Sequence, residues 1–193
     1  MSNKKGLYFV LGVLCFSVIA LSVAFAALSN TLTINFGNVV QQVETWNICF
    51  NTSISDPTPG GTSDTGRSCG AASATCSTVT IANTSLSKPG DSCTWNLQVK
   101  NTGSIAATFN AITATAPSGV TCANSNNNAT MTCGNIKYSL TSNGTTALAT
   151  GGTVAASTGT MAVVLKAEYV GTGVNGSAIT QSGAKFTLGF TQA

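Results

Sequence analysis

The hydrophobic and polar positions of this chain alternate most regularly between residues 93 and 100. Every second residue there is apolar and the residues between are polar, with the apolar face made of Cys93, Trp95, Leu97 and Val99. A repeat of two residues is typical of a β-strand that is dry on one face and wet on the other. Because Trp95 has the largest apolar surface in the stretch, we expect the core of the domain to form around it.

The same alternation predicts further strands at residues 29–36, 43–50, 76–82, 105–114, 136–140, 160–169 and 185–191, and a hairpin between residues 120 and 133. In the fourth of these stretches the apolar residues in step are Ile105, Ala107, Phe109 and Ala111. Residues 51–74 show no such pattern, and their prolines and glycines indicate a long exposed loop. Eight or nine strands without a helix after the leader favour an all-β fold, an antiparallel jelly-roll or Ig-like β-sandwich over residues 37–193.

Residues 1–26 have the pattern of a secretory signal peptide. A basic start is followed by an uncharged apolar run, residues 7–27, which can form a hydrophobic helix. The run ends in the A-x-A motif that signal peptidase recognises, made of Ala24 and Ala26 with Ala27 directly after it.

Three outcomes are open for this hydrophobic segment, in the order in which we favour them. Signal peptidase cleaves after Ala26, or the segment is retained as a membrane anchor, or a prepilin-type cut after Gly6 keeps it as a filament core. All three place the rest of the chain outside the cytoplasm, secreted or at the cell surface. The membrane is then contacted only through this N-terminal segment.

Composition indicates a folded domain with little surface charge. Only 7% of the residues are charged, 43% are hydrophobic and none is histidine, whereas disordered chains are usually rich in charge. The net charge is +3, of which Lys4 and Lys5 in the leader contribute two, so about +1 is left for the rest. The sequence has no basic patch, and nucleic acid is therefore not an expected partner.

Six of the seven cysteines lie beyond the leader, which holds Cys15. An even number in an exported chain predicts a disulfide framework, with participants Cys49, Cys69, Cys76, Cys93, Cys122 and Cys133. Cys122 and Cys133 fall on the two legs of the predicted hairpin and are the best pair. We expect Cys69–Cys76 to close the base of a loop, which leaves Cys49–Cys93 to join two strands that carry tryptophan.

The chain offers no constellation of catalytic residues. Nucleophile triads and zinc sites mostly depend on histidine, and the five acidic residues are scattered rather than paired. Asp56 and Asp64 share the long loop without the Asp-x-Asp spacing of calcium sites, so solvation explains them better. We therefore expect no enzyme activity, no cofactor and no metal site.

Two motifs flank the central strand, L-S-K-P-G-D-S at residues 86–92 and V-K-N-T-G-S at residues 99–104. Together they resemble the L-x-P-G-D and V-x-N-T-G-S core of the camelysin/TasA family of secreted biofilm-matrix proteins. The leader, running through Phe25-Ala26-Ala27-Leu28-Ser29 into a strand, is similar to that family's export signal. The six cysteines and the scarcity of lysine and aspartate depart from the family. The metalloprotease label of some relatives does not transfer, because H-E-x-x-H is absent.

The resemblance implies a jelly-roll-like sandwich and an extracellular fibre, in a plan similar to archaeal bundling pili. Each subunit's N-terminal strand would complete the sheet of its neighbour, so the partner is a second copy of the chain. Residues 27–36 are the expected donor strand, with the apolar side chains of Leu32, Ile34 and Phe36. The alternatives are a type IV pilin-like subunit with the apolar helix as filament core, and a membrane-anchored adhesin or binding module.

Overall fold

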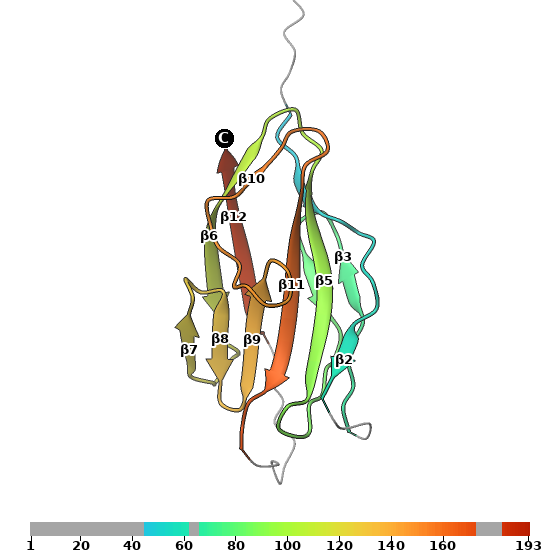
Figure 1. Ribbon diagram of the computed structural model, residues 1–193, viewed down its shortest axis with the longest axis vertical. Helices are drawn as coiled ribbons and strands as arrows, with labels where there is room; N and C mark the ends of the chain where they lie inside the picture. The colour runs from blue at the N-terminus through green and yellow to red at the C-terminus, as the bar shows by residue number, and fades with distance from the viewer. Residues whose placement is uncertain (1–44, 62–65, 173–182) are drawn as a thin grey trace, which may run out of the picture. The chain divides into compact units, whose positions relative to one another are not determined.

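The computed structural model describes residues 45–61, 66–172 and 183–193, and these form an all-β domain (Figure 1). Its twelve strands are β1 (Ile48–Phe50), β2 (Thr58–Gly60), β3 (Ala72–Ala74), β4 (Val79–Ile81), β5 (Ser92–Asn101), β6 (Ala107–Thr115), β7 (Cys122–Ser125), β8 (Thr130–Cys133), β9 (Ile136–Thr141), β10 (Thr153–Val154), β11 (Thr160–Tyr169) and β12 (Lys185–Gln192). Within these ranges, no helix has the length and hydrophobicity needed to cross a membrane. The leader, its expected cleavage residues and the expected donor strand lie outside the described residues.

β5 and β11 form the centre of a seven-stranded antiparallel sheet. β11 pairs with β5 from Thr160 opposite Lys100 to Glu168 opposite Ser92. Beyond β11 the sheet continues through β9, β8 and β7, and on the other side of β5 it ends in β1 and β2. The alternation at residues 93–100 and 160–169 is thereby confirmed, as two strands of ten residues each.

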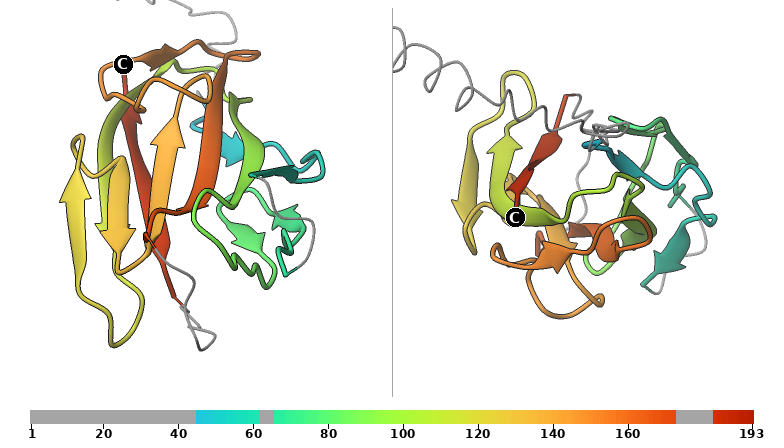
Figure 2. Two further views of the ribbon diagram at one scale, coloured as in Figure 1. Left: turned by 60° about the horizontal axis from the view of Figure 1, so that its bottom comes forward. Right: turned by 90° about the horizontal axis from the view of Figure 1, so that it is seen from above.

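Two smaller sheets complete the domain. β6 lies between β10 and β12, and it pairs with β12 from Ala107 opposite Gln192 to Thr115 opposite Lys185. β3 and β4 form a separate hairpin. In both views of Figure 2, β6 and β12 lie on the left and the hairpin lies on the right, beside β5.

A register shift interrupts the pairing of β6 with β12. Ala111 lies opposite Gly189 and Phe109 lies opposite Phe190, so Asn110 is an extra residue in β6. Such a bulge reverses the alternation of side chains along the strand. Phe109 is buried as predicted, but the prediction that Ala111 lies on the dry face is wrong. Ala111 is exposed, and Ile112 is buried in its place.

One hydrophobic cluster joins the sheets. Most of its buried members come from the large sheet and from β6, and the partly buried side chains packed against it include those of β12 and of the β3–β4 hairpin. The sheets therefore share one core, in a sandwich-like arrangement. Trp95 is only 2% exposed within this cluster, which confirms the expectation that the core forms around it.

Residues 51–74 contain more structure than their sequence pattern indicates. They include β2 and β3, although the pattern predicts a loop. Conversely, the strand predicted over residues 43–50 begins only at Ile48 in the described part, and Trp46 is 39% exposed. Strands of two or three residues are too short to show alternation, which explains why twelve strands are described where eight or nine are predicted.

Candidate functional site

The outer edge of β12 is the candidate functional site. Within the described part of the chain, β12 has a strand neighbour on one side only, namely β6. The strand is eight residues long and carries a single charged residue, Lys185, at its start. A long open edge presents a row of backbone N–H and C=O groups with which another strand can pair.

The hydrogen bonds of the small sheet show which backbone groups face this edge. Ala193 donates its N–H to the carbonyl of Ala106, so the chain directly after β12 is hydrogen-bonded to the chain directly before β6. Phe109 exchanges both of its backbone bonds with Gly151 and Gly152, on the side of β6 away from β12. Since antiparallel pairs alternate between bonded and non-bonded positions, the N–H and C=O of Phe190, opposite Phe109, point to the outer edge of β12.

The side chains on the inner face of β12 form an apolar row along this edge. Phe186, Leu188 and Phe190 pack against the core but are only partly buried. The ring of Phe190 lies 5.2 Å from the ring of Phe109, measured between centroids. A strand added at this edge would therefore extend both the backbone ladder and the apolar face of the small sheet.

The edges of the large sheet are less suited to accept a strand. β1 and β2 have three residues each, and Pro59 in β2 lacks a backbone donor. β7 has four residues and is fixed to β8 by the disulfide between Cys122 and Cys133. Short strands and prolines are the usual means by which proteins protect sheet edges, and β12 has neither.

All six cysteines beyond the leader form disulfides, and the pair Cys122–Cys133 is confirmed. The other two predicted pairs are wrong. Cys49 is bonded to Cys76 with their Cα atoms 4.3 Å apart, and Cys69 is bonded to Cys93 with their Cα atoms 5.6 Å apart.

The path of residues 51–91 explains this connectivity. Phe50 donates its backbone N–H to the carbonyl of Cys76, which brings Cys76 beside Cys49 on β1. Cys69 instead precedes Gly70, whose carbonyl accepts the indole N–H of Trp95, so Cys69 lies over β5 and beside Cys93.

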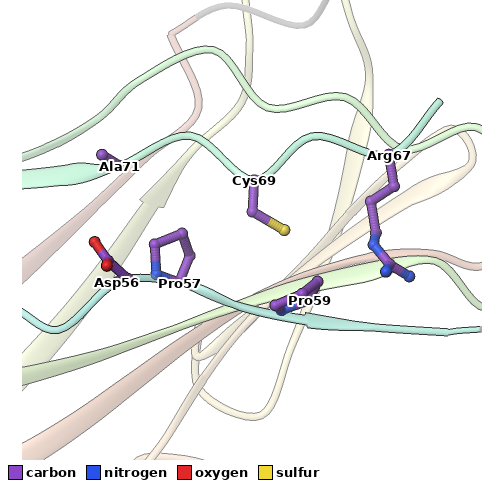
Figure 3. Close-up of a pocket in the computed structure, with 6 residues that line it drawn as sticks. All are labelled: Asp56, Pro57, Pro59, Arg67, Cys69 and Ala71. Carbon is purple, nitrogen blue, oxygen red and sulfur yellow. The ribbon is translucent and has the colours of Figure 1, made fainter. Parts of the chain in front are cut away.

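A shallow pocket of about 420 Å³ opens beside β2 (Figure 3). Its lining combines prolines with one acidic and one basic side chain: Asp56, Pro57, Pro59, Arg67, Cys69 and Ala71. Asp64, the other acidic residue of the predicted loop, lies outside the described residues. Arg67 donates a hydrogen bond from Nη1 to the carbonyl of Gly60 at 2.8 Å, which ties it to β2.

Behind Arg67 lies a buried carboxylate, that of Asp91, which is 1% exposed. Its Oδ2 accepts hydrogen bonds from the backbone N–H groups of Ser87 and Lys88, both at 3.0 Å, and from the Ser87 hydroxyl at 3.1 Å. Its Oδ1 has no hydrogen-bond partner, and Arg67 Nη1 lies 3.9 Å away. Burial by itself raises the pKa of Asp91, but the bonds from Ser87 and Lys88 and the charge of Arg67 outweigh it and hold the pKa below 3.8.

The two motifs that flank β5 thus close its two ends. Asp91 of P-G-D fixes the turn before the strand, while Asn101 of N-T-G-S fixes the turn after it. The side chain of Asn101 is fully buried, donates to the carbonyls of Ile105 and Val154, and accepts from the N–H of Gly103. Both residues therefore have structural roles that explain their places in the motifs.

No three His, Cys, Asp or Glu side chains come together to hold a metal ion within residues 45–61, 66–172 and 183–193. The cysteines of this part are all in disulfides. Lys166 and Glu168 form a half-exposed surface ion pair at 3.0 Å, of the kind that contributes little to stability.

No protein-family model, curated protein or solved structure matches this chain. The resemblance to the camelysin/TasA family is carried by the motifs at residues 86–92 and 99–104 and by the leader, and it stays a prediction.

Proposed function

We propose that this protein is the structural subunit of an extracellular or cell-surface fibre. Residues 27–36 of one copy add as a strand to the outer edge of β12 in the next copy, and thereby complete a jelly-roll-like sandwich. The observation that carries the proposal is the long, unprotected edge of β12 beside the partly buried apolar row of Phe186, Leu188 and Phe190.

The pattern of the donor segment matches this edge. Leu32, Ile34 and Phe36 are spaced two residues apart, as are the three apolar residues of β12. Side chains on one face of paired strands meet as direct or diagonal neighbours, so the donor's apolar residues can pack beside those of β12. Each buried side chain of this size contributes roughly 1.5–3 kcal/mol.

Repetition of this contact gives a fibre rather than a closed dimer. The donor segment and the acceptor edge are different surfaces, and a contact between different surfaces that does not close into a ring continues indefinitely. The three disulfides are compatible with an oxidising compartment outside the cytoplasm. In this role the chain is a building block with its own copies as partners, and no catalytic residue is assigned.

The test places one new charge on either face of the donor segment. Ile34→Asp puts a carboxylate on the apolar face, and Asn35→Asp puts the same charge on the polar face one residue away. Exported protein is examined by electron microscopy for fibres and by circular dichroism for folding. We expect both variants to fold and only Asn35→Asp to form fibres. Fibres of Ile34→Asp would refute strand donation, and an unfolded Ile34→Asp monomer would show that the segment belongs to its own sheet.

A further inference from the structure

Two large hydrophobic side chains stand out as exposed in the described part of the chain. Trp46 is 39% exposed and Val170 is 42% exposed. Single exposed apolar residues are common on protein surfaces, so exposure alone assigns no role to either of them. Their positions relative to β5 are what make them informative.

Trp46 and Val170 lie at opposite ends of the domain. Trp46 directly precedes β1, which pairs with the last residues of β5, from Val99 to Asn101. Val170 directly follows β11, whose Glu168 lies opposite Ser92, the first residue of β5. A ten-residue strand spans about 30 Å, and this length separates the two side chains.

The backbone beside Trp46 is held firmly, so its exposure does not come from a loose chain end. Thr45 donates its N–H to the Ser104 hydroxyl at 2.9 Å, and Ser104 returns a bond from its own N–H to the Thr45 carbonyl at 2.9 Å. On the other side of the tryptophan, Thr102 donates its N–H to the Asn47 carbonyl at 3.0 Å.

Val170 is held in the same way at the opposite end. Its N–H donates to the carbonyl of Asn135 at 2.8 Å, and Tyr169 is bonded through its backbone to both Gly90 and Asp91. Each end therefore presents an apolar side chain on a fixed backbone, which lowers the entropy lost when a partner surface covers it.

β12 runs from the Val170 end of the domain to the Trp46 end. β12 finishes at the Trp46 end, because Ala193 is bonded to Ala106 and the Thr45–Ser104 pair lies beside this turn. It begins at the Val170 end, where β11 ends, as Figure 1 shows. Every strand pair in the described residues is antiparallel. A donor strand antiparallel to β12 would therefore have its last residue, Phe36, at the Val170 end of the acceptor.

We infer that the Trp46 end of each copy packs against the Val170 end of the next copy, so that Trp46 and Val170 meet at the junction. This inference rests on the proposed function. Residues 37–44 connect the donor strand to Thr45, and the distance they span is at most about 30 Å. In the proposed fibre Phe36 lies at the acceptor's Val170 end, so this connection keeps the donor's Trp46 end within that distance of it. Residues 45–47 and 102–104, which lie beside Trp46, carry no charge, and Glu44 directly precedes them along the chain.

Tryptophan fluorescence tests this contact directly, because the chain has only two tryptophans and Trp95 is buried. Acrylamide quenching of the monomer should report Trp46, and most of that quenching should be lost when the full exported chain assembles. A Trp46→Phe variant should show little quenching in either state, which assigns the signal to Trp46.

Charge substitutions give a second readout. Trp46→Asp and Val170→Asp should each raise the protein concentration needed for assembly by roughly tenfold. Because the two side chains meet in the same contact, the double variant should raise this concentration by much less than the product of the two single increases. The matched control is Asn96→Asp, exposed in the middle of β5, which should assemble as the wild type does. Fibres in which Trp46 stays fully quenchable, or in which both Asp variants assemble like the control, would overturn the junction alone. A wild-type chain that forms no fibres would overturn the proposed function and the junction together.

Discussion

The indole N–H of Trp95 donates a hydrogen bond to the backbone carbonyl of Gly70 at 2.8 Å. This bond ties the central strand β5 to the segment that leads into β3, and both residues are buried. Trp95→Phe keeps an aromatic ring but leaves the Gly70 carbonyl without its donor, so we expect a loss of about 1–3 kcal/mol in the free energy of unfolding. Trp95→Ala should cost roughly 3–5 kcal/mol because it also leaves a cavity. Urea denaturation measures both, and losses below about 0.5 kcal/mol would contradict the placement of Trp95 in the core.

The disulfide connectivity is directly measurable. Trypsin cleaves after Arg67 and elastase cleaves after alanine, so digestion of the unreduced exported protein with both can separate the four cysteines. The cuts fall at Arg67 between Cys49 and Cys69, at Ala71, Ala72 or Ala74 between Cys69 and Cys76, and at Ala82 between Cys76 and Cys93. Mass spectrometry should then find Cys49 linked to Cys76 and Cys69 linked to Cys93. A peptide that links Cys69 to Cys76 would show that residues 51–91 follow a different path.

Asp91 should make the domain sensitive to acid. Its pKa is lower in the folded protein than the ordinary value of 3.8, so the stability that its ionised form provides is fully present above that value. This stability is lost as the pH falls below 3.8 through the lower pKa of the folded state. Asp91→Asn should cost about 1–3 kcal/mol at neutral pH, because the bonds to Ser87 and Lys88 lose their charge. Between about pH 5 and pH 2 the wild type should lose stability more steeply than this variant, and parallel curves would argue against the role of Asp91.

Hydrogen exchange distinguishes the two edges of β12. The N–H of Phe190 points to the outer edge, whereas Thr191 lies at a position bonded to β6. In the monomer we expect the amide of Phe190 to exchange quickly and that of Thr191 to exchange slowly. In fibres both should be protected, and Thr191 serves as the internal control. Protection of Phe190 already in the monomer would mean that a strand of the same chain covers this edge.

The longest strands could be predicted from the sequence because one of their faces is buried along most of its length. β5, β11 and the β7–β8 hairpin with its disulfide agree with the alternation and with the cysteine spacing. The bulge at Asn110 could not be predicted, since nothing in the local sequence shows that β12 has one residue fewer opposite β6. The exchanged cysteine partners were missed for a similar reason. Closeness in sequence favours Cys69–Cys76, whereas the fold of residues 51–91 places Cys69 over β5.

The candidate site was predictable only in part. The alternation of Phe186, Leu188 and Phe190 predicts a strand with an apolar face, but edge position depends on which strands pair, and that is a property of the whole sheet. Arg67 was not singled out, because a lone arginine in a polar segment carries no pattern. Its place beside Asp91 comes from the turn at residues 87–91 and from its bond to Gly60.

The central claim is that residues 27–36 of one copy complete the small sheet of the next. Cryo-electron microscopy of fibres formed by the exported chain tests this most directly. We predict continuous density from Thr45 of one copy to a strand that pairs antiparallel with the outer edge of β12 in the neighbouring copy, with Leu32, Ile34 and Phe36 facing its core. A fibre whose core is a bundle of the N-terminal apolar helices, or a strand 27–36 that pairs within its own copy, would contradict the account.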